Sequence, residues 1–128
     1  STPASYTNYG NSLVWVSAPG GDFRYPGNEL CDLPRMPAGI IRTNCWVMDM
    51  VMSTGTTFSN TGYFWSAGTS MAAPAASAVA ALMKQRNPNA TPAQLKTGLA
   101  QSAIDEGKKG QHACHGRGYV NALRAVTQ

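Results

Sequence analysis

The feature of this sequence that most constrains its fold is a long apolar run in the second half of the chain. Residues 71–83 are mainly Ala, Val, Leu and Met, and Asn87–Pro88 follows shortly after. Ala favours a helix and Pro cannot continue one, so we predict a helix from about Ser70 to Arg86. Because residues 71–83 are apolar nearly all round, we expect this helix to be buried on most sides. Residues 1–66 offer few apolar partners, so we also expect something outside these 128 residues to cover it.

The hydroxyl of Ser70 lies where this helix begins. The first N–H groups of a helix have no intrahelical partner and carry its positive dipole end, so they can stabilise an oxyanion. Gly68 has no Cβ and lets the backbone approach a substrate, and Pro74 falls early, where its missing donor costs little. Two interpretations are open from these residues alone: Ser70 is a nucleophile, or it belongs to an ordinary helix cap.

Three segments of the chain resemble the subtilisin-like serine proteases, and they occur in the family's order. Residues 68–74 read G-T-S-M-A-A-P, which is similar to the family's nucleophile motif G-T-S-M-A-x-P. Residues 4–10 (A-S-Y-T-N-Y-G), followed by A-P-G at 18–20, resemble the family's A-x-F-S-N-Y-G, short strand and A-P-G. Residues 116–122 (G-R-G-Y-V-N-A) resemble its closing G-x-G-x-V-N-A. The similarity is weakest between Gly21 and Met48.

The resemblance implies a serine endopeptidase that hydrolyses peptide or protein substrates through an acyl-enzyme. Ser70 would be its catalytic nucleophile, and Gly68 and Thr69 would shape the turn and bind substrate. It also implies an α/β fold, here the C-terminal portion of the family's three-layer αβα architecture. We expect a few short strands, a long buried helix and two further helices.

Part of the catalytic machinery is missing from this sequence. A serine nucleophile needs a base, which in turn needs an orienting carboxylate. Subtilisins carry these groups in the order Asp, His, Ser, yet no His precedes Ser70. The upstream acids, Asp22, Glu29, Asp32 and Asp49, sit in no family-like Asp motif. We therefore expect residues 1–128 to be the C-terminal part of one catalytic domain. Its N-terminal part would supply Asp, His and the oxyanion Asn, and the isolated chain would be inactive.

The two histidines of the chain, His112 and His115, follow the nucleophile in a Gly-rich segment. The adjoining match at 116–122 assigns this segment to a structural turn of the family, which argues against a relocated base. A zinc site with Cys114 is also disfavoured, because three ligands within four residues would be cramped. Calcium is common in the family, but no Asp-rich ligand run is visible. The sequence therefore assigns no metal or cofactor.

Local signals define further elements. Residues 13–17 and 46–54 are β-type runs, and Thr54 to Asn60 is a polar loop. Residues 91–94 (T-P-A-Q) form a capping box with Pro at the first helical position, so a second helix should run to about Ser102. Asn121 is a good N-cap for a short last helix, 122–127.

The three cysteines bear on the cellular compartment. Cys31 and Cys45 flank a loop that contains Pro and Gly, and a disulfide between them would contribute about 2–4 kcal/mol. The alternative is two reduced, buried thiols. Cys114 is then left over, which suggests a partner upstream of this chain. Disulfide pairing and the family resemblance indicate a secreted or extracellular protein, with the periplasm as the alternative.

Charge and hydropathy exclude two classes of partner. Ten Lys and Arg against six Asp and Glu give a formal net charge of +4, and the basic residues are scattered rather than clustered. This pattern does not predict a nucleic-acid site, and no run of about 18 apolar residues predicts a membrane span. Three interpretations remain: part of a subtilisin-like endopeptidase, an inactive module of the same fold that binds peptides or protein partners, or an unrelated Ala-rich domain. Three matching segments in order favour the first, whereas the missing His and Asp support the second.

Overall fold

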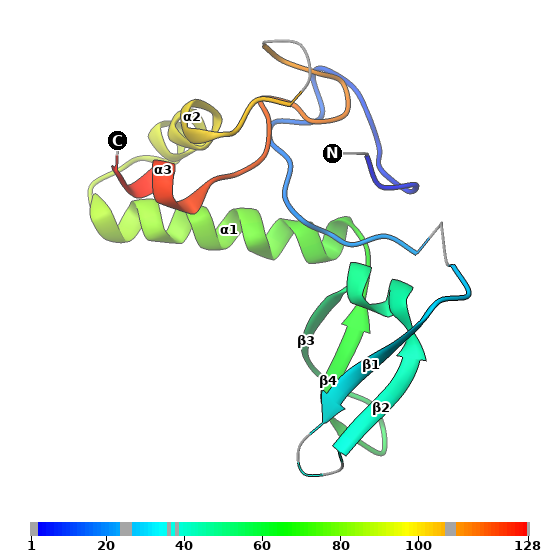
Figure 1. Cartoon of the computed structure of the whole chain (residues 1–128). Helices are drawn as coiled ribbons and strands as arrows, with labels where there is room; N and C mark the ends of the chain where they lie inside the picture. Colours follow the sequence, from blue (N-terminus) through cyan, green and yellow to red (C-terminus); the bar gives the residue numbers. More distant parts are fainter. Residues whose placement is uncertain (1–2, 24–26, 36, 38, 107–109, 128) are drawn as a thin grey trace.

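The chain folds into helices on one side and short hairpins on the other. The structure, a computed structural model, describes residues 3–23, 27–35, 37, 39–106 and 110–127. Its elements in chain order are β1 (Leu30–Arg35), β2 (Gly39–Asn44), the 3-10 helix η1 (Cys45–Asp49), β3 (Val51–Thr56), β4 (Thr61–Ser66), α1 (Thr69–Arg86), α2 (Pro92–Ser102) and α3 (Ala122–Thr127). Figure 1 shows the three helices gathered together and both hairpins projecting from the region where α1 begins.

The helices begin and end where the local signals predict. At α2, the N–H of Gln94 donates to the Thr91 hydroxyl (3.3 Å) and the N–H of Thr91 donates to the Gln94 side chain (2.8 Å). This reciprocal pair satisfies two N–H groups that the helix itself leaves without partners. At α3, the Asn121 side chain accepts from the N–H of Arg124 at 2.8 Å. The predicted bounds of the three helices are confirmed to within one residue, since α1 begins at Thr69.

The core lies between the three helices and is small. α1 packs against α2 and α3, and α2 packs against α3. Its buried side chains among the described residues are those of Val79, Ala90, Ser102, Ala103 and Ala125. Ser102 is fully enclosed, and its hydroxyl donates to the carbonyl of Gly98 at 2.8 Å, so its burial leaves no polar atom unsatisfied.

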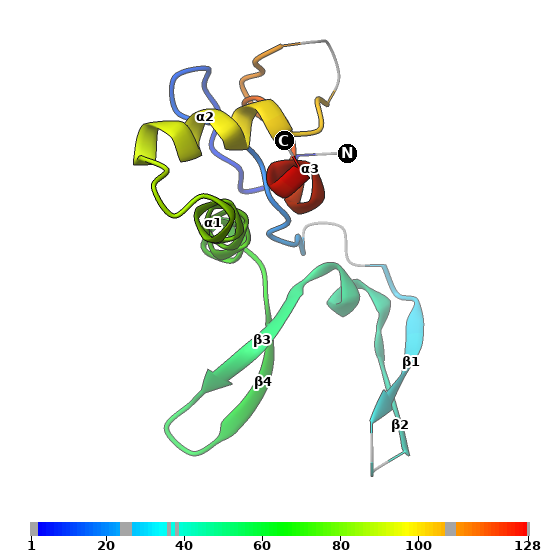
Figure 2. The same cartoon turned by 90° about the vertical axis from the view of Figure 1, so that its left-hand side faces the viewer.

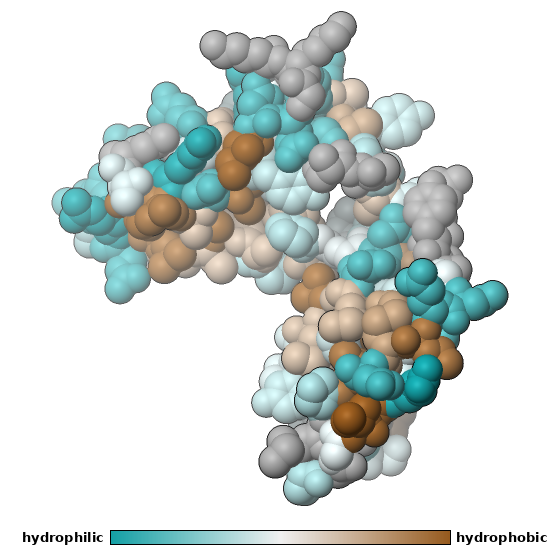
Figure 3. Space-filling view, in the orientation of Figure 1, coloured by the Kyte–Doolittle hydropathy of each residue, from teal (hydrophilic) through white to brown (hydrophobic). Residues whose placement is uncertain are grey.

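The expectation that α1 is buried on most sides is wrong for this chain. Val79 is the one buried residue of α1, and Leu82 remains 42% exposed. The physical reason is that α2 and α3 cover only part of its circumference, and no sheet of the described residues packs against the rest. Figure 3 accordingly shows hydrophobic surface open to solvent over the helices as well as over the hairpins.

The hairpins correct the predicted strand pattern. The loop expected between Cys31 and Cys45 is the β1–β2 hairpin, which pairs Cys31 with Thr43 and Leu33 with Ile41. Residues 36 and 38 of that loop lie outside the described residues. The run at 46–54 is a strand only from Val51 onward, because residues 45–49 form η1. The loop predicted at 54–60 is shortened at its start by β3, which runs to Thr56 and pairs with β4, Met52 opposite Trp65. Figure 2 shows the two hairpins as separate ribbons.

The N-terminal segment runs beside the C-terminal loop rather than forming a strand of its own. The run predicted at 13–17 contributes one isolated bridge, in which Ser17 pairs with Tyr119, and Tyr119 in turn pairs with Ile104. The N–H of Ser17 donates to Gly118 (2.9 Å), and its carbonyl accepts from Val120 (2.9 Å). The matching segments at residues 4–20 and 116–122 are therefore neighbours in space. Within the described ranges, no helix is both long and apolar enough to cross a membrane.

Candidate active site

Ser70 is the second residue of α1, and its side chain is exposed. Gly68 occupies the N-cap position with φ +156° and ψ 166°, a backbone conformation that is essentially restricted to glycine. Its carbonyl accepts from the N–H groups of Met71 (3.0 Å) and Ala72 (3.3 Å), whereas the first two helical N–H groups, those of Thr69 and Ser70, have no intrahelical acceptor. No side chain caps this helix end, so Ser70 is not an N-cap. The exposed hydroxyl thus lies beside two amides at the positive end of the longest helix.

The structure brings no base to this hydroxyl. The Ser70 side chain makes no hydrogen bond to any described residue. His112 is engaged elsewhere, with its Nε2 atom 3.7 Å from an Asp105 carboxylate oxygen and its backbone exchanging two hydrogen bonds with Gly116. The His115 ring lies 6.1 Å from that of Tyr119. Among the described residues, then, Ser70 stands without the partners that serine catalysis requires.

The turn before Ser70 packs closely against the A-P-G segment. The N–H of Gly68 donates to the carbonyl of Gly20 at 2.8 Å. A Cβ atom placed on Gly20 would lie 2.7 Å from the Gly68 carbonyl oxygen and 3.2 Å from the Ala72 Cβ, so a larger residue could not fit without moving the backbone. Two of the matching segments are therefore joined backbone to backbone at the candidate nucleophile.

Tyr6, from the matching segment at residues 4–10, also contacts this backbone. Its hydroxyl donates toward the carbonyls of Gly20 (3.0 Å) and Gly21. Burial raises the pKa of Tyr6 above its ordinary 10.0 and the nearby Asp22 carboxylate raises it further, while a hydrogen bond from the Gly68 backbone acts in the opposite direction. In the sequence, Tyr6 stands out only as part of the motif at residues 4–10. The available signal was the Tyr itself, at a position where the matching motif has Phe.

A wide, open cavity of about 990 Å³ adjoins this turn. Its walls come from residues 3–22, from the Ala72, Ala73 and Ala76 side of α1, and from the loop that carries Cys114 and His115. Gly68 and Thr69 line it, but Ser70 does not. Cys114 is a free, half-exposed thiol on the wall of this cavity.

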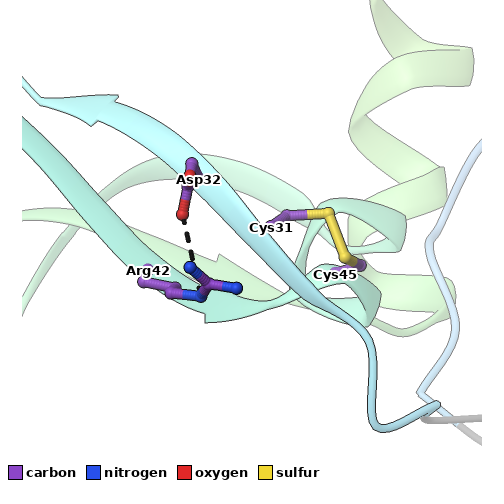
Figure 4. The surroundings of a disulfide bond; sticks show 4 residues. All are labelled: Cys31, Asp32, Arg42 and Cys45. Carbon is purple, nitrogen blue, oxygen red and sulfur yellow. Dashed lines mark ion pairs between the residues drawn. A yellow bond between two sulfur atoms is a disulfide. The ribbon is translucent and has the colours of Figure 1, made fainter.

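The predicted disulfide is present and lies away from this turn. Cys31 and Cys45 are bonded, with their Cα atoms 4.9 Å apart, so the alternative of two reduced thiols is wrong. Figure 4 shows the bond closing the base of the β1–β2 hairpin, next to an exposed ion pair between Asp32 and Arg42 (4.0 Å). In the part of the chain that the structure describes, no three His, Cys, Asp or Glu residues are grouped so that they could hold a metal ion.

Solved structures and curated proteins resemble this chain over different lengths. A protease from Pseudoalteromonas arctica PAMC 21717 matches with a TM-score of 0.69 and 33% identity, over 97% of this chain and 31% of its own. A lanthipeptide protease matches with a TM-score of 0.67 and 29% identity, over 95% of this chain and 36% of its own.

Serine protease AprX of Bacillus subtilis (strain 168) is 41% identical over 64 residues, which are 50% of this chain and 14% of that protein. Subtilisin-like protease SBT3.6 of Arabidopsis thaliana is 43% identical over 54 residues, 42% of this chain and 7% of that protein. This chain thus spans only a small part of the length of its curated relatives. The model of the subtilase family matches residues 1–119. The chain therefore belongs to the subtilase family of serine proteases.

Proposed function

We propose that this chain provides the nucleophile, Ser70, of a secreted serine endopeptidase. The observation that carries the proposal is the exposed Ser70 hydroxyl, without a hydrogen bond to the described residues, at the N-terminus of an 18-residue helix. Family membership supports the reaction class, since subtilases are serine proteases. The Cys31–Cys45 disulfide supports a location outside the reducing cytosol, extracellular or periplasmic.

The chain would act as the C-terminal part of one catalytic domain. Its N-terminal part would supply the His that removes the Ser70 proton, the Asp that orients this His and the Asn that donates to the oxyanion. The Ser70 Oγ atom then attacks the scissile carbonyl of a peptide or protein substrate. The N–H of Ser70, which the helix leaves without an acceptor, donates to the oxyanion of the tetrahedral intermediate. Loss of the amine gives the acyl-enzyme, which water hydrolyses.

A substitution of Ser70 tests this function in the protein that carries the chain. Ser70→Ala should abolish peptide hydrolysis and covalent labelling by a fluorophosphonate; in subtilisin, removing the nucleophile lowers kcat by about 10⁶-fold. Ser77→Ala is a matched control, because Ser77 is also exposed on α1 but lies beyond its first turns. Hydrolysis and labelling that persist in Ser70→Ala would overturn the assignment.

A second candidate is an inactive module of the same fold that binds peptides or protein partners. The observation that favours it is the lack of a His or Asp partner for Ser70 among the described residues. This candidate predicts that the wild-type protein is neither labelled by the fluorophosphonate nor able to hydrolyse peptides, but still binds a peptide library with unchanged affinity after Ser70→Ala.

A further inference from the structure

The Tyr6 hydroxyl and Gly68, the residue two positions before Ser70, meet at the same carbonyl, that of Gly20. Its hydroxyl donates toward the carbonyls of Gly20 (3.0 Å) and Gly21, and the same Gly20 carbonyl accepts the N–H of Gly68 at 2.8 Å. The Gly20 carbonyl therefore accepts hydrogen bonds both from Tyr6 and from Gly68, in the turn at residues 67–70 that we call the nucleophile turn. A displacement of the Gly20 carbonyl would be transmitted directly to Gly68.

We propose that the hydroxyl of Tyr6 positions the nucleophile turn. By holding the Gly20–Gly21 carbonyls, it fixes the Gly68 backbone and hence the direction in which α1 presents the Ser70 hydroxyl. Tyr6 acts through Gly20 and touches neither Ser70 nor a reacting atom, so it is a positioning residue. This inference rests on the proposed role of Ser70.

Outside α1 itself, the backbone hydrogen bond that holds Gly68 among the described residues is the one to Gly20. Thr69 and Ser70 are exposed, and β4 enters the turn from a hairpin that projects away from the helices. On the other side, space at Gly20 is already exhausted, since a Cβ there would lie 2.7 Å from the Gly68 carbonyl oxygen. In a turn that is closely packed but held by few hydrogen bonds, the hydrogen bond from Tyr6 to Gly20 can determine the backbone geometry. Reacting groups must be held within fractions of an ångström for efficient catalysis.

Tyr6 is itself well anchored. The carboxylate of Asp22 accepts from the N–H of Ser5 (2.7 Å) and from its hydroxyl (2.9 Å), which fixes the backbone next to Tyr6. The Tyr6 ring stacks on that of Phe23, with centroids 6.2 Å apart. Burial also raises the pKa of Tyr6, so the hydroxyl keeps its proton and remains a donor throughout the neutral range. The ring and the backbone are thus held independently of the hydroxyl.

The hydroxyl can therefore be removed with little other change. The matching motif has Phe at this position, which indicates that the ring alone is compatible with the fold. In this chain the hydroxyl is present and is used in hydrogen bonds to the Gly20 and Gly21 carbonyls. Tyr6→Phe deletes the bond to Gly20 and Gly21 and keeps the ring stacked on Phe23.

The test measures kcat, KM and the rate of fluorophosphonate labelling for Tyr6→Phe in the protein that carries the chain. We expect kcat and the labelling rate to fall about three- to tenfold, while KM stays within about twofold. Tyr9→Phe is the matched control: Tyr9 is 73% exposed, and its hydroxyl bonds to no described residue, so its kinetics should equal wild type.

A second control separates positioning from plain loss of stability. Thr91→Ala removes the cap of α2, far from the turn in sequence. It should lower the free energy of unfolding about as much as Tyr6→Phe does, with kcat unchanged. If Tyr6→Phe keeps the wild-type kcat and labelling rate, or if Thr91→Ala lowers them equally, the inference is wrong. If Tyr6→Phe fails to accumulate folded protein, Asp22→Asn weakens the hold on the Ser5 backbone beside Tyr6 and should lower the labelling rate in the same direction.

The Ser70→Ala variant keeps this test distinct from that of the proposed function. An active Ser70→Ala protein would refute the proposed function itself. An inactive Ser70→Ala protein together with a fully active Tyr6→Phe protein would refute only the role of Tyr6.

Discussion

At the scale of single residues, two glycines allow the nucleophile turn to form, each for a different reason. Gly68 is required for its backbone conformation, since φ +156° is rarely adopted by residues with a side chain. Gly20 is required for space, because the Gly68 carbonyl oxygen lies 2.7 Å from where its Cβ would be. The two effects are independent, although the residues touch.

Gly20→Ala should therefore displace the turn. The new methyl group meets backbone, which cannot rotate away, so the Gly68 carbonyl must move. We expect kcat/KM for peptide hydrolysis to fall by at least about tenfold, because small displacements of reacting groups are costly. Gly62→Ala is the control: a Cβ at Gly62 meets no atom within 4 Å, and activity should stay within about twofold of wild type. Equal activities of the two variants would show that the turn tolerates this movement.

Tyr6 also gives the protein a specific response to alkaline pH. Burial first, and then the charge of Asp22, raises the pKa of Tyr6 above 10.0 in the folded state. The folded protein therefore holds this proton more tightly than the unfolded chain. Its stabilising contribution is complete below pH 10 and is lost as the pH rises through the raised folded value. Urea unfolding at roughly pH 8 and roughly pH 11 should show a smaller alkaline loss for Tyr6→Phe than for wild type. Parallel pH curves would contradict this expectation.

The site could be predicted from sequence only as far as neighbouring residues determine it. The position of Ser70 follows from Gly68 and the apolar run behind it, which act within a few residues of each other. The contact between Gly20 and Gly68, and the link through Tyr6, join residues far apart in the chain, and no local spacing reports such a contact. The absence of a capping role for Ser70 likewise emerged from the geometry of Gly68.

At the scale of elements, the helices were easier to predict than the strands. Helix ends depend on local hydrogen bonds, such as those of Thr91 and Asn121, so their signals lie within a few residues. Strands depend on a partner elsewhere. Residues 13–17 have the composition of a strand, but among the described residues they reach only one bridge, at Tyr119. Residues 61–66 lack a clear alternation, yet they form β4 because β3 is available to pair with them.

The capping box of α2 offers a test at this scale. Thr91→Ala removes the hydroxyl that accepts from Gln94 and should lower the free energy of unfolding by about 1 kcal/mol. Thr97→Ala is a matched control in the same helix: the Thr97 hydroxyl donates to the Ala93 carbonyl inside the helix, and Ala has the higher helix propensity. Its effect should be smaller than about 0.5 kcal/mol. Urea titration of both variants measures these losses in the free energy of unfolding. Equal losses for Thr91→Ala and Thr97→Ala would argue against a capping role of Thr91.

At the scale of the whole molecule, the exposed surface of α1 and the lack of a base beside Ser70 have a common explanation. The helix that should be buried has one buried residue, Val79, and the serine that should have a base has none among the described residues. Both are accounted for if further residues of the catalytic domain cover the open side of α1 and bring a His to Ser70. The exposed apolar surface and the missing chemistry then have one cause.

The chain of these 128 residues, prepared alone, should accordingly hydrolyse peptides no faster than its Ser70→Ala variant. In subtilisin, loss of the catalytic His alone lowers kcat by about 2 × 10⁶-fold, because the triad acts as a unit. The amides at the start of α1 would still attract an oxyanion, so slow labelling by a reactive fluorophosphonate is compatible with this expectation. The measurement compares both chains under identical conditions, with the complete protein as the positive control. Robust hydrolysis by the isolated chain that disappears in Ser70→Ala would mean that a base exists within these residues, and His112 or His115 would then have to reach Ser70 in a rearranged loop.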